Sequence, residues 1–248
     1  MNYGVKIIKI MAKNNFEKEI QGIIKAYDHL VLGVEKKAKT GIEGRAYGGI
    51  IRAGKGELVV SIAKEVLTIA CDLLGIDRRR ITFPTHGVKV PIRKDYIERI
   101  KNPQIKRYIL DNISECYYLQ NTDLPIYIDD KFVMGIECKA YTENAMMKRI
   151  LVDFTLLKEV HPQLDCILFQ LESQLGGDFS KLGNPALGSF RTHTLLSFFD
   201  VDLLIITLLH GERKVDEPIH KTNYYKPLTK ESLYGAIQIF KKLLRKYK

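Results

Sequence analysis

The sequence has little of what marks membrane, secreted or zinc-binding proteins. Its 248 residues include only 4 cysteines and 8 prolines, and no apolar run reaches the length of a transmembrane helix. The apolar segment 7–11 is too short and too interrupted for a signal peptide. The cysteines are widely spaced without a C-x-x-C pair, which argues against a zinc site and a disulfide framework (Cys71, Cys116, Cys138 and Cys166). These absences predict a protein of the reducing cytoplasm with no membrane association.

The composition is that of a globular protein with an excess of positive charge. Hydrophobic residues make up 46% and charged residues 27% of the chain, which is long enough to bury a sizeable core as one domain, 1–248. The 39 basic and 29 acidic residues leave a net charge of +10. Such an excess favours a polyanionic partner, although many proteins are this basic without binding nucleic acid.

The segment from Asp123 to Lys139 predicts two strands joined by a tight polar turn. Residues 126–128 and 132–136 are rich in β-formers, and the turn-forming residues 129–131 separate them. Because side chains alternate between the faces of a strand, Glu137 and Lys139 share one face. A hairpin folded about residue 130 places Asp123 beside Glu137. Asp129 is a second candidate acid, but this register places it at the far tip.

One carboxylate on each strand, with a lysine two residues beyond the second, suits a hard divalent cation and an activated water. Mg²⁺ prefers oxygen ligands and keeps several waters, so Asp123, Glu137 and the backbone carbonyl of Cys138 are sufficient to hold it. A bound metal polarises a phosphoryl oxygen and lowers the pKa of a bound water. Lys139 can orient that water or stabilise negative charge on a phosphate.

These residues resemble the motif of the PD-(D/E)XK nucleases, which include most type II restriction endonucleases. Asp123, Glu137 and Lys139 match its acid, second acid and lysine. Thr122 stands where the motif has proline, and Pro125 comes two residues too late. The resemblance implies an α/β fold, with a restriction-endonuclease-like mixed central β-sheet flanked by helices. It also implies Mg²⁺-dependent hydrolysis of phosphodiester bonds to 5′-phosphate ends.

The elements around the hairpin agree with this resemblance. A helix at 145–160 and an apolar strand at 166–171 follow the hairpin, in the order expected for the catalytic core of that superfamily. The predicted apolar stripe of this helix is Met146, Ile150, Phe154 and Leu157. We place this core at about 57–210, between helical elaborations at both ends of the chain. Further helices are predicted at 12–39, 57–74, 95–118 and 232–248. The predicted buried set of the helix 95–118 is Tyr96, Ile97, Ile100, Ile105, Tyr108, Ile109 and Ile113.

A glutamate on the helix before the hairpin is a further candidate for the site. The resemblance implies that such a residue helps to bind metal or water, and Glu57 or Glu65 could fill this role. The alternative, a solvated helix face, is equally compatible with the sequence. The glycine-rich stretch 41–56, which precedes this helix, is predicted to be a connecting loop, with a contact to DNA or a partner subunit as the alternative.

Two later segments carry candidate DNA contacts. The stretch 173–192 is rich in glycine and predicts a loop too long for a simple connection. Lys181, Asn184 and Arg191 in this stretch, and His193 directly after it, are residue types that hold phosphates or read bases, with an oligomer contact as the alternative. Arg213 and Lys214 follow a predicted strand at 201–209, at an edge where a substrate groove is often built.

The sequence therefore predicts a type II restriction endonuclease that cleaves double-stranded DNA at a specific sequence with Mg²⁺. A symmetric target site would favour a homodimer. A structure-specific or repair nuclease with the same core is the enzymatic alternative. A non-catalytic DNA-binding protein, in which the acidic hairpin is incidental, is the alternative of another class.

Overall fold

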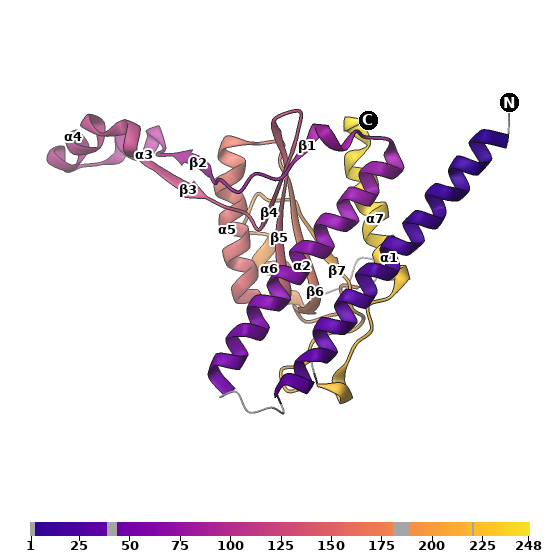
Figure 1. Cartoon of the computed structure of the whole chain (residues 1–248). Helices are drawn as coiled ribbons and strands as arrows, with labels where there is room; N and C mark the ends of the chain where they lie inside the picture. Colours follow the sequence, from indigo (N-terminus) through magenta and orange to yellow (C-terminus); the bar gives the residue numbers. More distant parts are fainter. Residues whose placement is uncertain (1–2, 39–43, 181–188, 220) are drawn as a thin grey trace.

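A five-stranded mixed β-sheet forms the centre of the protein (Figure 1). The structure, a computed structural model, describes residues 3–38, 44–180, 189–219 and 221–248, with side chains described from residue 16 to 33 and from residue 54 onward within these ranges. The strands lie in the order β1-β4-β5-β6-β7: β1 (Ile81–Thr82), β4 (Leu124–Ile128), β5 (Lys131–Glu143), β6 (Asp165–Gln174) and β7 (Leu203–Thr207). The first three strands pair antiparallel, whereas β5, β6 and β7 pair parallel.

Helices cover both faces of this sheet. The first face packs against α2 (Gly44–Leu74) and α7 (Lys230–Leu244), and α1 (Tyr3–Ala38) packs against these two helices. The second face packs against α5 (Asn144–Val160) and α6 (Phe190–Leu196). The buried residues of α5 recur at helical spacing and include the predicted Ile150, Phe154 and Leu157. The predicted fold class, an α/β protein with a mixed central sheet flanked by helices, is confirmed.

A second, two-stranded sheet extends to one side of the core as an arm (Figure 1). We define the arm as residues 88–120, which comprise β2 (Val88–Pro91), α3 (Lys94–Arg99), α4 (Pro103–Asp111) and β3 (Tyr117–Gln120). The strands β2 and β3 pair antiparallel, from Val88 opposite Gln120 at the base to Pro91 opposite Tyr117. Short 3₁₀ helices complete the described elements: η1 (Arg78–Arg80), η2 (Ile113–Glu115), η3 (Thr222–Tyr224) and η4 (Arg245–Tyr247).

The arm corrects the prediction of one helix over 95–118. Pro103 starts α4 at its first position, and the Asn102 side chain caps it by accepting hydrogen bonds from two backbone N–H groups. A proline disfavours helical backbone in the residue before it, so the chain breaks at Asn102 and starts a new helix. The predicted buried set is also wrong: Ile97 is buried, whereas Tyr96, Ile105, Tyr108 and Ile113 are exposed and Ile100 and Ile109 lie between the two classes.

The glycine-rich stretch is the second correction. Residues 44–56 were predicted to be a loop but form the first turns of α2, while 41–43 lie outside the described residues. Glycine costs about 1 kcal/mol in a helix interior, which packing can offset. A Cβ on Gly54 would touch Leu30 of α1 at 4.0 Å, so α1 and α2 lie close together here. The C-terminal end of α2 is as predicted, because Gly75 follows it with a φ of 72°.

The remaining elements lie near their predicted positions. The helix α1 begins earlier than the predicted residue 12, and β7 is shorter than the predicted strand 201–209. The segment 173–192 was predicted to be a loop, but its described part contains the end of β6 and the first three residues of α6. No described helix has the length and apolar character needed to cross a lipid bilayer.

Candidate active site

The β4–β5 hairpin brings Asp123, which immediately precedes β4, beside Glu137 in the middle of β5. Its turn consists of Asp129 and Asp130, whose φ values of 50° and 61° are typical of a two-residue type I′ turn. Leu124 lies opposite Ile136, so the next residues in each direction are Asp123 and Glu137. A bulge beside Ile126 shifts the register only near the tip. The register predicted from the sequence is confirmed over the part of the hairpin that positions these acids.

Lys139 joins the two carboxylates. Its Nζ donates hydrogen bonds to Asp123 Oδ2 at 2.5 Å and to Glu137 Oε2 at 2.8 Å. Glu137 and Lys139 share a face of β5, as the alternation of a strand requires. The three predicted residues therefore form one compact cluster at the edge where β4 begins.

Burial changes the proton affinity of this cluster. The side chain of Glu137 is 8% exposed. This burial, together with the nearby charge of Asp123, raises the pKa of Glu137 to about 7 although Lys139 opposes the shift. Burial alone would lower the pKa of Lys139, but Glu137 and Asp123 outweigh it and raise that pKa above its ordinary value. Lys139 is therefore a cation at neutral pH. Glu137 changes between its protonated and its ionised form near pH 7.

The backbone of Cys138 contributes to the same site. Its N–H donates a hydrogen bond to Asp123 Oδ2 at 2.8 Å, which holds that carboxylate against β5. The N–H and C=O of a strand residue point to the same side of the strand, so the carbonyl of Cys138 also faces Asp123. The Cys138 thiol lies in the core that packs against α2, and burial raises its pKa well above the ordinary value. The side chain thus plays no part in the site, whereas the backbone is available to it.

A polar cavity of about 340 Å³ opens between this cluster and α5. Glu137 and Lys139 line one side of it, and Arg149 and Asp153 of α5 line the other. Burial raises the pKa of Asp153, and a hydrogen bond from Gln120 opposes this shift. The side chain of Gln120 is almost fully buried, and its Oε1 has no hydrogen-bond partner. The cavity therefore holds a third acid and an amide oxygen that is available to a ligand or water.

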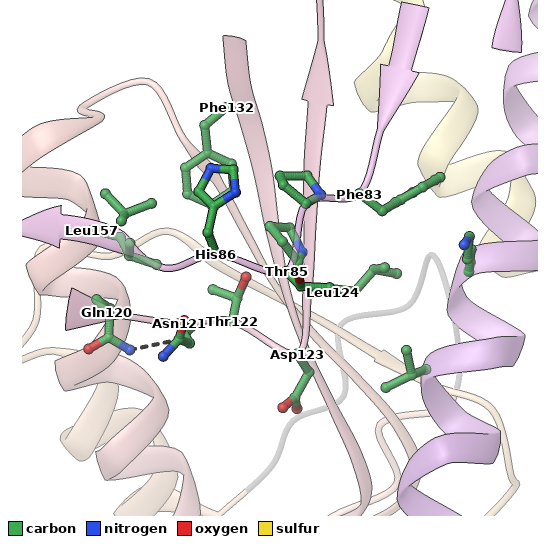
Figure 2. Close-up of a pocket in the computed structure, with 15 residues that line it drawn as sticks. Phe83, Thr85, His86, Gln120, Asn121, Thr122, Asp123, Leu124, Phe132 and Leu157 are labelled. Carbon is green, nitrogen blue, oxygen red and sulfur yellow. Dashed lines mark hydrogen bonds between the residues drawn. The ribbon is translucent and has the colours of Figure 1, made fainter. Parts of the chain in front are cut away.

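A second cavity, of about 360 Å³, is lined in part by residues 120–125 (Figure 2). In this view the carboxylate of Asp123 lies at the bottom of the drawn residues and the ring of Phe132 at the top. Lys64 of α2 lines this cavity, with its Nζ 4.7 Å from the centre of the Phe83 ring. Asp123 thus borders two cavities, one polar and one with aromatic walls.

Other candidate acids lie away from the cluster. Asp129 is at the hairpin tip, where Arg80 donates to both of its carboxylate oxygens at 2.9 and 2.7 Å. Glu57 is exposed on α2 and lines neither of the two cavities described above. Glu65 is near Glu19 and Arg78, whose pKa values it raises, and so faces the α1 side. The structure does not bring Glu57 or Glu65 together with Asp123.

The candidate DNA contacts lie near the ends of the parallel strands, as far as they are described. Lys181 and Asn184 lie outside the described residues. Arg191 and His193 are exposed on α6, whose Thr192 donates to Asn144 at the start of α5 (2.8 Å).

Two further candidates follow β7. The guanidinium of Arg213 stacks on the ring of Tyr141 at 3.9 Å. Tyr141 lies two residues beyond Lys139 on the same strand. Lys214 is exposed and forms an ion pair with Glu217 at 3.2 Å. Arg213 is thus held beside the cluster, whereas Lys214 points to solvent.

Asp153, Gln120 and Arg149 were not predicted from the sequence. A signal for Asp153 exists, because it recurs at helical spacing with the predicted stripe residues Met146, Ile150 and Leu157 of α5. An acid on an otherwise apolar stripe is unusual and marks a polar environment. Gln120 offers no such signal, since its burial depends on the arm that the sequence did not predict.

The donor set of the cluster fits a magnesium-like ion. The ammonium of Lys139 lies between one oxygen of each carboxylate, where it supplies the positive charge that a metal ion would bring. Among the described residues, no three histidine, cysteine or acidic side chains are arranged to hold a metal ion. Two carboxylates and a carbonyl suit Mg²⁺, which keeps several waters, better than a metal that requires a full set of protein ligands.

The fold and this cluster together define a candidate metal-dependent hydrolase, and comparison with known proteins is more specific. The type II restriction enzyme DdeI of Desulfomicrobium norvegicum (strain DSM 1741 / NCIMB 8310) is 45% identical over 225 residues, which cover 89% of this chain and 94% of the relative. The chain belongs to this family of type II restriction enzymes. The predicted enzyme class is thereby confirmed. No protein-family model matches the sequence, and no solved structure matches the chain.

Proposed function

We propose that this protein is a PD-(D/E)XK nuclease that cleaves double-stranded DNA at a specific sequence with Mg²⁺, leaving 5′-phosphate ends. The observation that carries the proposal is the cluster of Asp123, Glu137 and Lys139 on one hairpin, in a chain related to a type II restriction enzyme. The relationship favours this activity over a repair nuclease or a non-catalytic DNA-binding protein.

Each residue of the cluster has a distinct role in the proposed reaction. Asp123, Glu137 and the carbonyl of Cys138 would hold Mg²⁺, which when bound polarises the scissile phosphate and acidifies a water. Lys139 is charged at neutral pH, so it donates hydrogen bonds to the attacking water and to the phosphate as negative charge builds up. The N–H of Cys138 keeps Asp123 oriented.

Further residues would hold the DNA and the attacking water. Arg213, fixed by Tyr141, is placed to contact a phosphate beside the cleaved bond. Arg191, His193 and Lys214 are proposed as outer contacts, together with Lys181 and Asn184. Asp153 and Gln120 face the same cavity as Glu137 and are proposed to order water within it. The active protein is proposed to be a cytoplasmic homodimer.

Incubation of the purified protein with long phage DNA tests the proposed function. Discrete fragments in Mg²⁺ and intact DNA in Ca²⁺ are expected, because Ca²⁺ occupies oxygen sites with looser geometry. Mapping the fragment ends would give the target sequence and the position of the 5′-phosphate. A smear in Mg²⁺ would instead indicate a nuclease without sequence specificity. Intact DNA in both ions would contradict the proposal.

Metal affinity is expected to depend on pH because Glu137 must lose its proton to become a ligand. With its pKa raised to about 7, Glu137 is protonated below that pH and ionised above it. The affinity for Ca²⁺, measured by calorimetry without DNA, should fall roughly tenfold for each pH unit below 7 and level off above it. Glu137→Gln should bind weakly, with this pH dependence removed. A wild-type affinity that is constant between pH 5.5 and 7 would contradict the role of Glu137.

Replacement of Asp153 by asparagine is expected to slow cleavage by about 10–100-fold, the usual effect of losing a group that orients metal-bound water. The shape of the side chain is retained, so KM should change little while kcat falls. Steady-state kinetics on an oligonucleotide duplex would measure both constants. Asp165→Asn, at the start of β6, is the matched control and should cleave normally. Equal rates for Asp153→Asn and the wild type would show that Asp153 takes no part in the reaction.

A further inference from the structure

The tip of the arm exposes an unusual number of large hydrophobic side chains. Six of the sixteen exposed ones among the described side chains lie in residues 94–117, which we call the arm tip: Tyr96, Ile105, Tyr108, Leu110, Ile113 and Tyr117. The helix α4 is strongly amphipathic in sequence, yet none of its residues is buried. A helix with an apolar face normally packs that face against another surface, and the part of the chain that the structure describes provides none here.

The charges of the arm tip indicate a protein partner. The tip carries five basic and four acidic residues, a balance of +1 (Lys94, Arg99, Lys101, Lys106 and Arg107; Asp95, Glu98, Asp111 and Glu115). Asp95 pairs with Arg93 and Arg99, and Asp111 pairs with Arg107. A surface that binds the phosphate backbone carries an excess of one sign. Tyrosines and aliphatic side chains within a rim of mixed charge are typical of protein interfaces.

We propose that the arm tips of two copies of this chain pack against each other and form the homodimer. A nine-residue helix such as α4 is not stable by itself in water, so its apolar face needs a partner that is present whenever the chain is folded. A second copy always meets this condition. A two-fold contact uses the same patch on both chains and requires both signs of charge on it. The tip has the size of the 20–30 residues that each partner contributes to an ordinary interface.

This interface would fix the two candidate active sites relative to each other. The strand β3 ends at Gln120, three residues before Asp123. At the base of the arm, a Cβ on Gly87 would lie 2.5 Å from Asn121 Oδ1 and 2.8 Å from Leu119 Cγ, so the two strands are tightly packed there. One site cuts one strand of a duplex at a time, so a double-strand break requires two sites. This need for two sites rests on the proposed function.

Sedimentation of the metal-free and DNA-free protein tests the interface separately from catalysis. The wild type is expected to be a dimer at micromolar concentration, and the double variant Ile105→Glu/Tyr108→Glu a monomer. Leu73→Glu, at a similarly exposed apolar residue on α2, is the matched control and should remain a dimer. Circular dichroism would verify the fold. Ile113→Glu, which lies outside α4, gives a second test that cannot disturb that helix and should weaken the dimer at least tenfold.

A plasmid assay then links the dimer to double-strand cleavage. The wild type should convert supercoiled plasmid to the linear form, whereas the double variant should accumulate nicked circles, with the first cut slowed only a few-fold. A monomeric wild type, or a double variant that stays dimeric, would overturn the interface whatever the cleavage result. The remaining outcome is a dimeric wild type with monomeric variants, while neither the wild type nor any variant cuts DNA. That result would support the interface and reject the proposed function.

Discussion

Lys139→Ala is expected to reduce DNA cleavage by at least about 10²–10³-fold, the usual loss when one group that stabilises transition-state charge is removed. DNA binding should be nearly unchanged. Lys139 Nζ contacts both carboxylates of the cluster, and its raised pKa keeps it positively charged at neutral pH. Alanine removes that charge and leaves Asp123 and Glu137 in place. Single-turnover cleavage in Mg²⁺ and binding in Ca²⁺ would separate the two effects.

Two matched variants make this prediction specific. Lys131→Ala removes a lysine from the beginning of the same strand, at the hairpin tip, and should cleave at the wild-type rate. Asp123→Asn should be as defective as Lys139→Ala, whereas Asp129→Asn should not, because Asp129 is paired with Arg80 at the tip. Wild-type rates for Lys139→Ala or Asp123→Asn would show that the catalytic site lies elsewhere.

Phe154→Ala is expected to lower the free energy of unfolding by about 3–5 kcal/mol, the usual cost of removing a buried phenylalanine ring. Phe154 is fully buried between α5 and the sheet. Its Cε1 lies 3.0 Å from the position that a Cβ on Gly135 would occupy, so the ring packs directly on the backbone of β5. Alanine would leave a cavity that this tightly packed region can only partly close. Urea unfolding followed by circular dichroism would measure the loss.

Val152→Ala on the same helix is the control for Phe154→Ala. Its side chain is 43% exposed, so its effect should stay within about 0.5 kcal/mol. If Phe154→Ala cost no more than this control, the α5 packing described here would be wrong. Phe154→Ala should also reduce DNA cleavage, because α5 carries Asp153 and Arg149 to the cavity beside Glu137.

The hairpin and its three polar residues could be predicted because they depend on local rules. Strand alternation places Glu137 and Lys139 on one face, and a two-residue turn at Asp129 fixes which residues lie opposite each other. The core helix α5 and the strand β6 follow from hydrophobic spacing alone. These features use contacts between residues that are near each other in sequence or share one periodic face.

The failed predictions concern features that depend on distant contacts or on one residue at a boundary. Helical spacing continued across Pro103, but the proline and the Asn102 cap divide the segment into two helices. The glycines before Gly56 suggested a loop. This prediction failed because the sequence does not show that α1 packs beside Gly54. Gln120 reaches the candidate site only because the arm returns there, so its position could not be predicted without predicting the arm.

The hairpin also has a consequence for folding. Lys139 and Asp123 are 16 positions apart in the chain, and a two-residue turn closes the hairpin between them. By contrast, Tyr27 of α1 reaches Lys226 across 199 positions. Contacts of short sequence separation form early, because closing a small loop costs less entropy than closing a large one. We therefore expect the cluster to assemble in the first part of the folding reaction, before the ends of the chain meet.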